Sequence, residues 1–234
     1  MKERGMIFNG EMVRAILDGR KTQTRRMLTP RQLEMIGYAA QAGECYPLES
    51  GQQHANSQAY YREWCPFGQL GDCIWVRETW ADVNHDGCPA VAYRADGEVR
   101  DLHEDDGDED DPRLEKYWFA AWYPDLISGT EGNWKPSIHM PRWASRITLE
   151  ITGVRVERLQ DISEEDAEAE GIDMEALADD QDCYDCIADH NFTGRPTAAG
   201  HFSYLWQSIY GAESWQANPW VWVVEFKRID GEAK

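Results

Sequence analysis

The chain has 234 residues and a formal net charge of −20, with 42% hydrophobic and 28% charged residues. This composition is typical of a globular protein and argues against a disordered one, and the length allows one large domain or two small ones. No run approaches the ~20 apolar residues of a membrane helix, and residues 1–12 lack the apolar stretch of a secretory signal, so we expect a cytoplasmic protein.

The charge is unevenly distributed along the chain. Residues 1–31 contain eight Lys or Arg and three Asp or Glu, whereas residues 96–111 contain ten acidic groups and one arginine. The acidic run therefore masks a basic N-terminal segment, so the net charge does not by itself exclude a nucleic-acid partner. Such runs are most often solvated loops, and a binding surface for a partner protein is the alternative.

The N-terminal part of the chain predicts a strand, a helix and a second extended segment. Residues 6–8 form a short apolar strand, and Asn9 can cap the helix that follows. Gly19 fits the left-handed position that ends such a helix. Residues 22–27, with two threonines, then favour a strand or an extended loop.

The rest of the chain predicts further elements separated by three loop-rich insertions. The insertions cover about 32–63 (with a helix near 31–41), 81–132 and 173–200. The predicted strands are 73–77, 146–156 and 220–226, and the predicted helices are 164–170 and 202–209. This order indicates a single α+β domain whose mostly antiparallel sheet is closed or curled around tryptophan-rich packing.

Gly19–Arg26 is the segment most suited to chemistry, because it places Lys21 and Thr24 three residues apart among basic neighbours. A lysine beside an apolar wall loses its proton more easily, so it could activate the Thr24 hydroxyl or a water molecule. The alternative is that Lys21 and the arginines hold phosphate or lie on a solvated strand.

Glu170 directly precedes Gly171 at the predicted end of helix 164–170. The helix dipole disfavours a negative charge at this end, so a carboxylate here could take up and release a proton. The alternative is that Glu170 is one more acid on an acidic helix.

Two further groups of residues could form sites. Cys183, Cys186, His190 and His201 could hold zinc, although the Cys-x₂-Cys-x₃-His spacing is tighter than usual. Trp75, Arg77, Trp80, Arg142 and Trp143 could stack on bases, although buried core tryptophans are the more common explanation. No phosphate-binding loop, dinucleotide-binding glycine motif or serine-hydrolase elbow is present.

Gly19–Arg26 resembles the ASCH-domain signature G-x-K-x-x-E-x-R of the PUA-like superfamily. The resemblance extends to 71–80, 146–172 and 218–229, and it is especially close to ASCH-like proteins of phages and prophages. It implies a small β-barrel flanked by helices and no cofactor. Thr24 stands where the signature has glutamate, as in small bacterial ASCH enzymes that hydrolyse the acetamide of N4-acetylcytidine.

The resemblance implies catalytic roles for Lys21, Thr24 and Glu170. We therefore expect an amidohydrolase acting on an acylated nucleoside or a related small amide, with Arg20, Arg26, Trp75 and Arg77 contacting the substrate. One alternative is a PUA-like RNA-binding module or ribonuclease in which the basic segment holds phosphates. Another is a phage accessory protein that binds a host protein through the acidic run 96–111.

Overall fold

The computed structural model describes residues 1–102, 117, 119–175 and 197–229. It confirms a mixed α+β chain, but its strands form two sheets where the sequence predicted one. The chain divides into two compact units, of which unit 1 comprises Met1–Arg4, Ala15–Ile74 and Leu149–Ile229. Unit 2 contains Gly5–Arg14 and Trp75–Thr148. The expectation of a single domain stays a prediction.

The larger sheet has the strand order β1-β3-β7-β8-β2, and the smaller sheet has the order β4-β5-β6. The strands are β1 (Glu3–Ile7), β2 (Gln23–Met27), β3 (Cys73–Arg77), β4 (Trp80–His85), β5 (Cys88–Tyr93), β6 (Val99–Asp101), β7 (Thr148–Arg158) and β8 (Trp220–Ile229). A barrel requires the two edge strands to pair, and the edge strands β1 and β2 are not neighbours. The described strands therefore form open sheets and no closed barrel, contrary to the small barrel expected from the sequence.

The helices confirm most of the elements expected outside the insertions. They are α1 (Gly10–Leu17), α2 (Pro30–Gln41), α3 (Leu48–Gly51), α4 (Ala55–Glu63), α7 (Tyr123–Ser128), α8 (Glu164–Ala169), α10 (Ala198–Tyr210) and α11 (Ala212–Gln216). Short 3₁₀ turns occur at Ser137–His139, Arg142–Ala144 and Leu159–Asp161. No helix in the described ranges combines the length and apolarity needed to cross a membrane.

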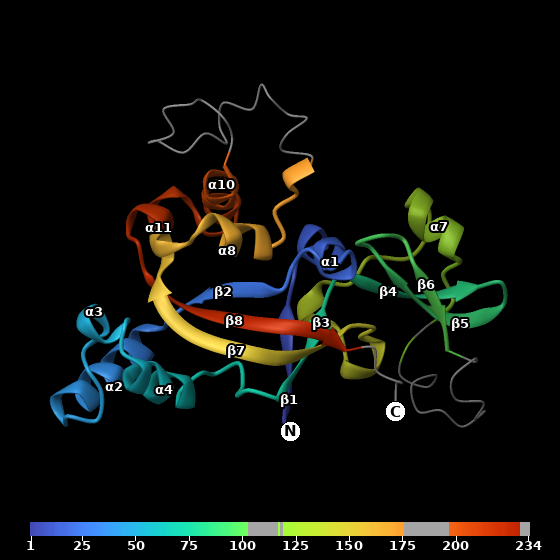
Figure 1. Cartoon of the computed structure of the whole chain (residues 1–234). Helices are drawn as coiled ribbons and strands as arrows, with labels where there is room; N and C mark the ends of the chain where they lie inside the picture. The colour runs from blue at the N-terminus through green and yellow to red at the C-terminus, as the bar shows by residue number, and fades with distance from the viewer. Residues whose placement is uncertain (103–116, 118, 176–196, 230–234) are drawn as a thin grey trace. The chain divides into compact units, whose positions relative to one another are not determined.

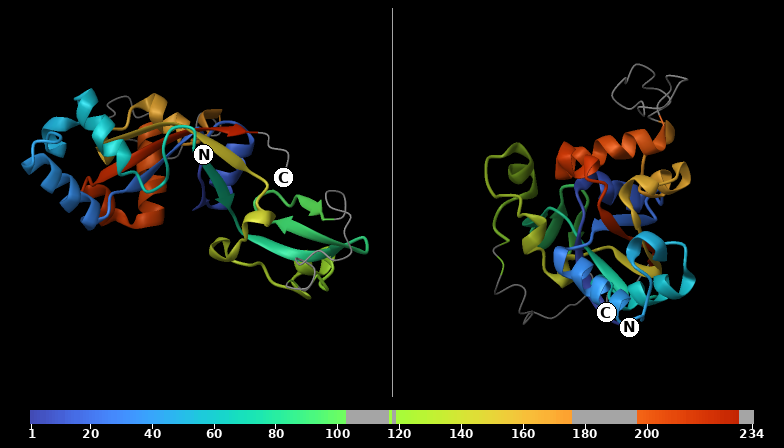
Figure 2. Two further views of the ribbon diagram at one scale, coloured as in Figure 1. Left: turned by 90° about the horizontal axis from the view of Figure 1, so that it is seen from below. Right: turned by 90° about the vertical axis from the view of Figure 1, so that its left-hand side faces the viewer.

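Unit 1 places helices on both sides of its strands. Figures 1 and 2 show α8, α10 and α11 on one side of β2, β8 and β7, and α2, α3 and α4 on the other. Along β8, Val221 and Val223 pack against Phe202 and Trp206 of α10. The intervening Trp222 lies within 3.5 Å of the side chain of Gln32 in α2. Successive residues of β8 therefore face opposite helical layers, as the two-residue period of a strand requires.

The first expected insertion is more regular than the sequence indicated. The predicted helix near 31–41 is confirmed as α2, where Thr29 and Gln32 form a reciprocal capping box and Pro30 occupies the first turn. Residues 48–63 add α3 and α4, which the weak periodicity did not predict. Gln58 of α4 is fixed to the backbone of Val156 in β7 by a pair of hydrogen bonds of 2.8 and 2.9 Å.

Unit 2 contains the second expected insertion, and its first part is a sheet where a loop was expected. Strands β4 and β5 pair antiparallel from Trp80–Tyr93 to His85–Cys88. The two-residue turn Asp86-Gly87 has positive φ at both positions, 52° and 93°. That geometry matches the twist of a tight hairpin, for which an Asp-Gly pair is a typical sequence signal. Of the third expected insertion, 173–200, residues 176–196 lie outside the described part.

Candidate functional site

Lys21 and Glu170 lie opposite each other where the end of α1 meets the end of α8 in unit 1. The two residues form an isolated antiparallel bridge. The Lys21 N–H donates to the carbonyl of Ala15, and the Thr22 N–H donates to the carbonyl of Ala169. Glu170 caps α8, as expected, and Gly171 follows with a φ of +98°. A Cβ at Gly171 would lie 2.9 Å from the Lys21 Cβ, so glycine permits this close approach.

The side chains of Lys21 and Glu170 form a buried ion pair. Lys21 Nζ donates to Glu170 Oε2 at 2.6 Å and to the Glu170 carbonyl oxygen at 2.8 Å. The exposed fraction is 0% for the Lys21 side chain and 3% for that of Glu170. Burial lowers the pKa of Lys21 below its ordinary value, and the adjacent Glu170 carboxylate offsets part of that effect. The structure thus joins two of the three side chains for which the sequence predicted catalytic roles.

Arg25 is a fully buried cation that shares the same carboxylate. It donates to Glu170 Oε1 at 3.1 Å, to Glu157 Oε1 at 2.6 Å and to Asp166 Oδ2 at 3.1 Å. Arg155 also binds both Glu157 and Asp166, so the cluster contains two arginines. Burial raises the pKa of Asp166, but Arg155 and Arg25 outweigh it and leave the pKa lowered. Sequence reasoning placed Arg25 only among phosphate-binding residues and missed this ion cluster.

Thr24 faces away from that cluster. It lies opposite Val224 on β8, whereas Arg25 lies opposite Val223, and directly paired residues share a face of the sheet. Val223 packs on the α10 side, and the Arg25 guanidinium lies 5.7 Å from the ring of Phe202 in α10. Thr24 is therefore on the α2 side. Its hydroxyl is buried and has no hydrogen-bond partner among the described residues.

Of the two arginines expected to contact the substrate, only Arg20 lies beside the ion pair. Arg20 is partly exposed, donates to the carbonyl of Gly171 at 2.8 Å and pairs with Asp18 at 3.0 Å. Arg26 lies two residues after Thr24 on β2 and opposite Trp222, so it shares the α2 side of the sheet with Thr24. It is partly buried and donates to the carbonyl of Arg25 at 3.2 Å.

The expected aromatic contacts belong to unit 2. The Arg77 guanidinium lies 5.3 Å from the ring of Trp75, so these two residues stack on each other. Trp80 is buried and meets Trp143 edge-on at 5.9 Å. Trp80 and Trp143 thus belong to the core of unit 2, the more common explanation for such residues.

The expected zinc site falls mostly on undescribed residues. Cys183, Cys186 and His190 lie outside the described ranges, and His201 is part of α10. No group of three or more metal-ligating side chains occurs within the ranges that the structure describes. Of the acidic run 96–111, residues 96–102 lie within the described ranges.

Unit 2 buries a second arginine among three carboxylates. Arg146 forms two hydrogen bonds with Glu78, at 2.9 and 3.0 Å, and pairs with Asp96 at 2.8 Å and with Glu98. Its guanidinium stacks 4.1 Å from the ring of Tyr93. Burial raises the pKa of Glu78 above its ordinary value, and Arg146 offsets part of that rise. Two acids of the acidic run are therefore structural partners of a buried arginine.

The chain matches no protein-family model, no curated protein and no solved structure.

Proposed function

We propose that the chain is an ASCH-like amidohydrolase of the PUA-like superfamily that acts on an acylated nucleoside such as N4-acetylcytidine. The observation that supports this function is the buried contact between Lys21 Nζ and Glu170 Oε2. It joins a base whose pKa is lowered by burial to a carboxylate that can relay a proton. The resemblance of Gly19–Arg26 to the ASCH signature supplies the substrate class.

The neutral form of Lys21 has the hydrogen-bonding pattern of a general base. A neutral amine has two N–H donors and one lone pair, and Glu170 offers two acceptors, Oε2 and the carbonyl oxygen. With both donors occupied, the lone pair is left to accept a proton from water. Because Thr24 faces the other side of the sheet, we propose water as the nucleophile and not the Thr24 hydroxyl.

The reaction then proceeds through one proton relay. Water gives a proton to Lys21, and its oxygen bonds to the acyl carbon. The carbon–nitrogen bond breaks, and the departing amine takes the proton from Lys21 through Glu170. Arg25 would hold the Glu170 carboxylate in place, and Arg20 would orient the substrate. The pair is closed to solvent, so the amide can enter only after a local opening.

The RNA-binding alternative receives less support from the basic segment. It needs Arg20, Lys21, Arg25 and Arg26 to hold phosphates, but Lys21 and Arg25 are buried and paired with carboxylates. Only Arg20 and Arg26 are then left for such contacts. RNA affinity that falls steeply with salt would favour this alternative.

Binding of a host protein through the acidic run 96–111 stays a prediction. Deletion of this run should then abolish capture of the host protein in a pull-down and leave any hydrolysis intact.

Release of cytidine from N4-acetylcytidine tests the proposed function. We expect turnover by the wild-type chain and a loss of about 10²–10⁴-fold in kcat/KM for Lys21→Met. Lys227→Met is the matched control, because Lys227 pairs with Glu150 at 3.1 Å in the same unit but is 60% exposed. Absence of turnover by the folded wild-type protein, or equal rates for both variants, would overturn the assignment.

Thr24→Val distinguishes the two nucleophiles. It keeps the size of the side chain and removes the hydroxyl, which has no described partner to lose. If water attacks, we expect the variant to keep kcat within about tenfold of wild type, since no group of the relay is removed. A loss as large as that of Lys21→Met in a folded variant would instead make Thr24 the nucleophile.

A further inference from the structure

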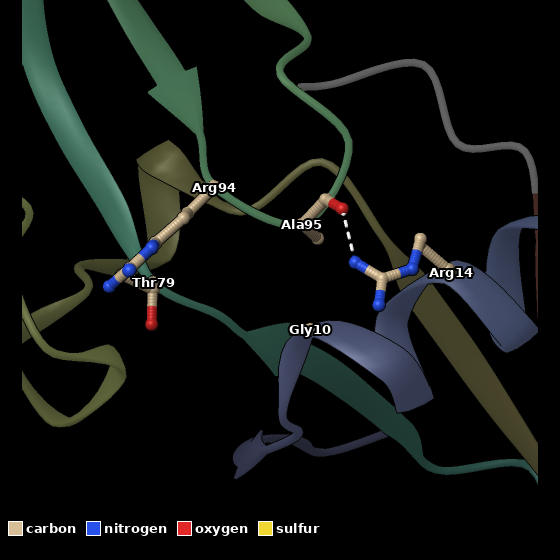
Figure 3. Close-up of a pocket in the computed structure, with 5 residues that line it drawn as sticks. All are labelled: Gly10, Arg14, Thr79, Arg94 and Ala95. Atoms are coloured by element: carbon tan, nitrogen blue, oxygen red, sulfur yellow. Dashed lines mark hydrogen bonds between the residues drawn. The ribbon is translucent and has the colours of Figure 1, made fainter. Parts of the chain in front are cut away.

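A pocket in unit 2 is lined by two arginines that belong to neither of the ion clusters described above. It has a volume of about 280 Å³ and is lined by Gly10, Arg14, Thr79, Arg94 and Ala95. Figure 3 shows Arg14 reaching from α1 toward Ala95, and Arg94 extending past Thr79. Arg14 donates to the carbonyl of Ala95 at 2.6 Å, which fixes its guanidinium at the pocket wall.

The two arginines have no carboxylate partner among the described residues, although the whole chain has a net charge of −20. The nearest acids in sequence, Glu78 and Asp96, adjoin Thr79 and Ala95. Both are bound by Arg146, which holds them with four hydrogen bonds of 2.8–3.0 Å. Arg146 thus occupies the carboxylate oxygens of both acids, so neither acid pairs with Arg14 or Arg94, and these two guanidinium groups keep donors for a ligand.

Thr79 and Gly10, which also line the pocket, add features that favour binding of an anion. The Thr79 hydroxyl has no hydrogen-bond partner among the described residues, so it can donate to a ligand. Gly10 is the first residue of α1, and the helix dipole places partial positive charge at that end. Guanidinium groups bind the oxygens of phosphate through paired hydrogen bonds, and a hydroxyl adds a third donor.

We propose that this pocket binds a phosphate group, either as the free ion or as the terminal phosphate of a nucleotide. Its volume lies just below the range of about 300–1,000 Å³ for drug-sized ligands, which suits a phosphate with a small attached group. The proposal does not rest on the amidohydrolase assignment, because every residue that carries it belongs to unit 2.

Calorimetric titration of the full chain with inorganic phosphate, adenosine 5′-monophosphate and adenosine tests the proposal; adenosine is used because cytidine is the product of the proposed reaction. We expect saturable binding of both phosphate-containing probes and none of adenosine. Tighter binding of the nucleotide identifies a nucleotide phosphate as the ligand, and equal affinities show that the phosphate group alone is recognised. Lack of phosphate binding, or adenosine binding as tight as that of the nucleotide, would overturn the proposal.

Arginine variants assign the binding to this pocket. Arg94 is exposed, so Arg94→Ala should fold, and we expect it to raise the Kd for phosphate about tenfold through loss of a charged hydrogen bond. Arg31→Ala removes the same charge from an exposed position of α2 in unit 1 and should leave the Kd within about twofold. Equal effects of the two substitutions would show that only net charge matters and would contradict a site at Arg94.

Discussion

Each of the two compact units buries one arginine among three carboxylates, but the two clusters differ in how many cations share the acids. In unit 1, the acids bound by Arg25 have second partners: Lys21 binds Glu170, and Arg155 binds Glu157 and Asp166. In unit 2, no other described cation pairs with the three acids of Arg146.

This difference separates a stabilising ion cluster from a candidate for proton transfer. In the Arg146 cluster of unit 2, the one cation among the described residues is an arginine, which does not lose its proton in proteins. In unit 1 the cluster includes a lysine whose pKa is lowered by burial and which shares Glu170 with Arg25. An arginine with three carboxylates is thus compatible with a purely structural role, and the lysine is what makes the unit 1 cluster a candidate site.

Removal of the buried arginine should therefore destabilise the fold more in unit 2 (Arg146) than in unit 1 (Arg25). We expect Arg146→Met to lower the free energy of unfolding by about 3–5 kcal/mol, because it leaves the buried Glu78 without a cation. Arg25→Met should cost about 1–3 kcal/mol, because each of its acids keeps another partner. Urea unfolding of both variants measures the two losses. A larger loss for Arg25→Met would show that Lys21 and Arg155 do not share the charge as described.

Substitution of Gly171 should disturb the packing around Lys21 without changing any charge. Gly171→Ala should cost about 2–4 kcal/mol, because φ is +98° and the new Cβ would lie 2.8 Å from the Ala15 Cβ and 2.9 Å from the Lys21 Cβ. Gly19→Ala is the control: φ is +78°, but nothing lies within 4 Å of the new Cβ, so only about 1–2 kcal/mol is expected. Equal losses in thermal or urea unfolding would contradict the close packing of Gly171 on Lys21.

The cost of losing Arg146 should shrink as the pH falls. Arg146 opposes the burial effect that raises the pKa of Glu78, so its removal raises that pKa further. A carboxyl whose pKa is higher in the folded state than in the unfolded state destabilises the fold as pH rises, and protonation relieves that cost. Between about pH 7 and about pH 5, the stability difference between wild type and Arg146→Met should fall by roughly 1–2 kcal/mol. A difference that grows on acidification would contradict this account.

Much of the secondary structure could be predicted, but the arrangement of the site could not. Caps and periodicity indicated α1, α8, α10 and the long strands correctly. The hairpin at Asp86-Gly87 was not predicted, because this single Asp-Gly pair precedes a long acidic stretch whose composition is typical of a loop. The open sheet was not predictable, because strand closure depends on contacts between residues far apart in sequence.

The sequence itself indicates that the side chains of Lys21 and Thr24 point to opposite faces of the sheet. A spacing of three puts two side chains on one face of a helix but on opposite faces of a strand, and residues 22–27 already favoured an extended segment. Lys21, Gln23 and Arg25 follow the strand period, and all three contact Asp166 or Glu170 of the α8 segment. The partners of Arg25 could not be predicted, because Glu157 and Asp166 follow it by more than a hundred residues.

The pH dependence of kcat/KM for N4-acetylcytidine, in wild type and in Glu170→Gln, tests most directly whether Lys21 and Glu170 form a proton-transfer pair. Measured from about pH 6 to about pH 10, the wild-type rate should rise through an inflection below 10.5, the ordinary value for lysine. The Glu170 carboxylate raises the pKa of Lys21, so Glu170→Gln should react more slowly and with its inflection at lower pH. A rate independent of pH, or the same inflection in both proteins, would contradict the central claim.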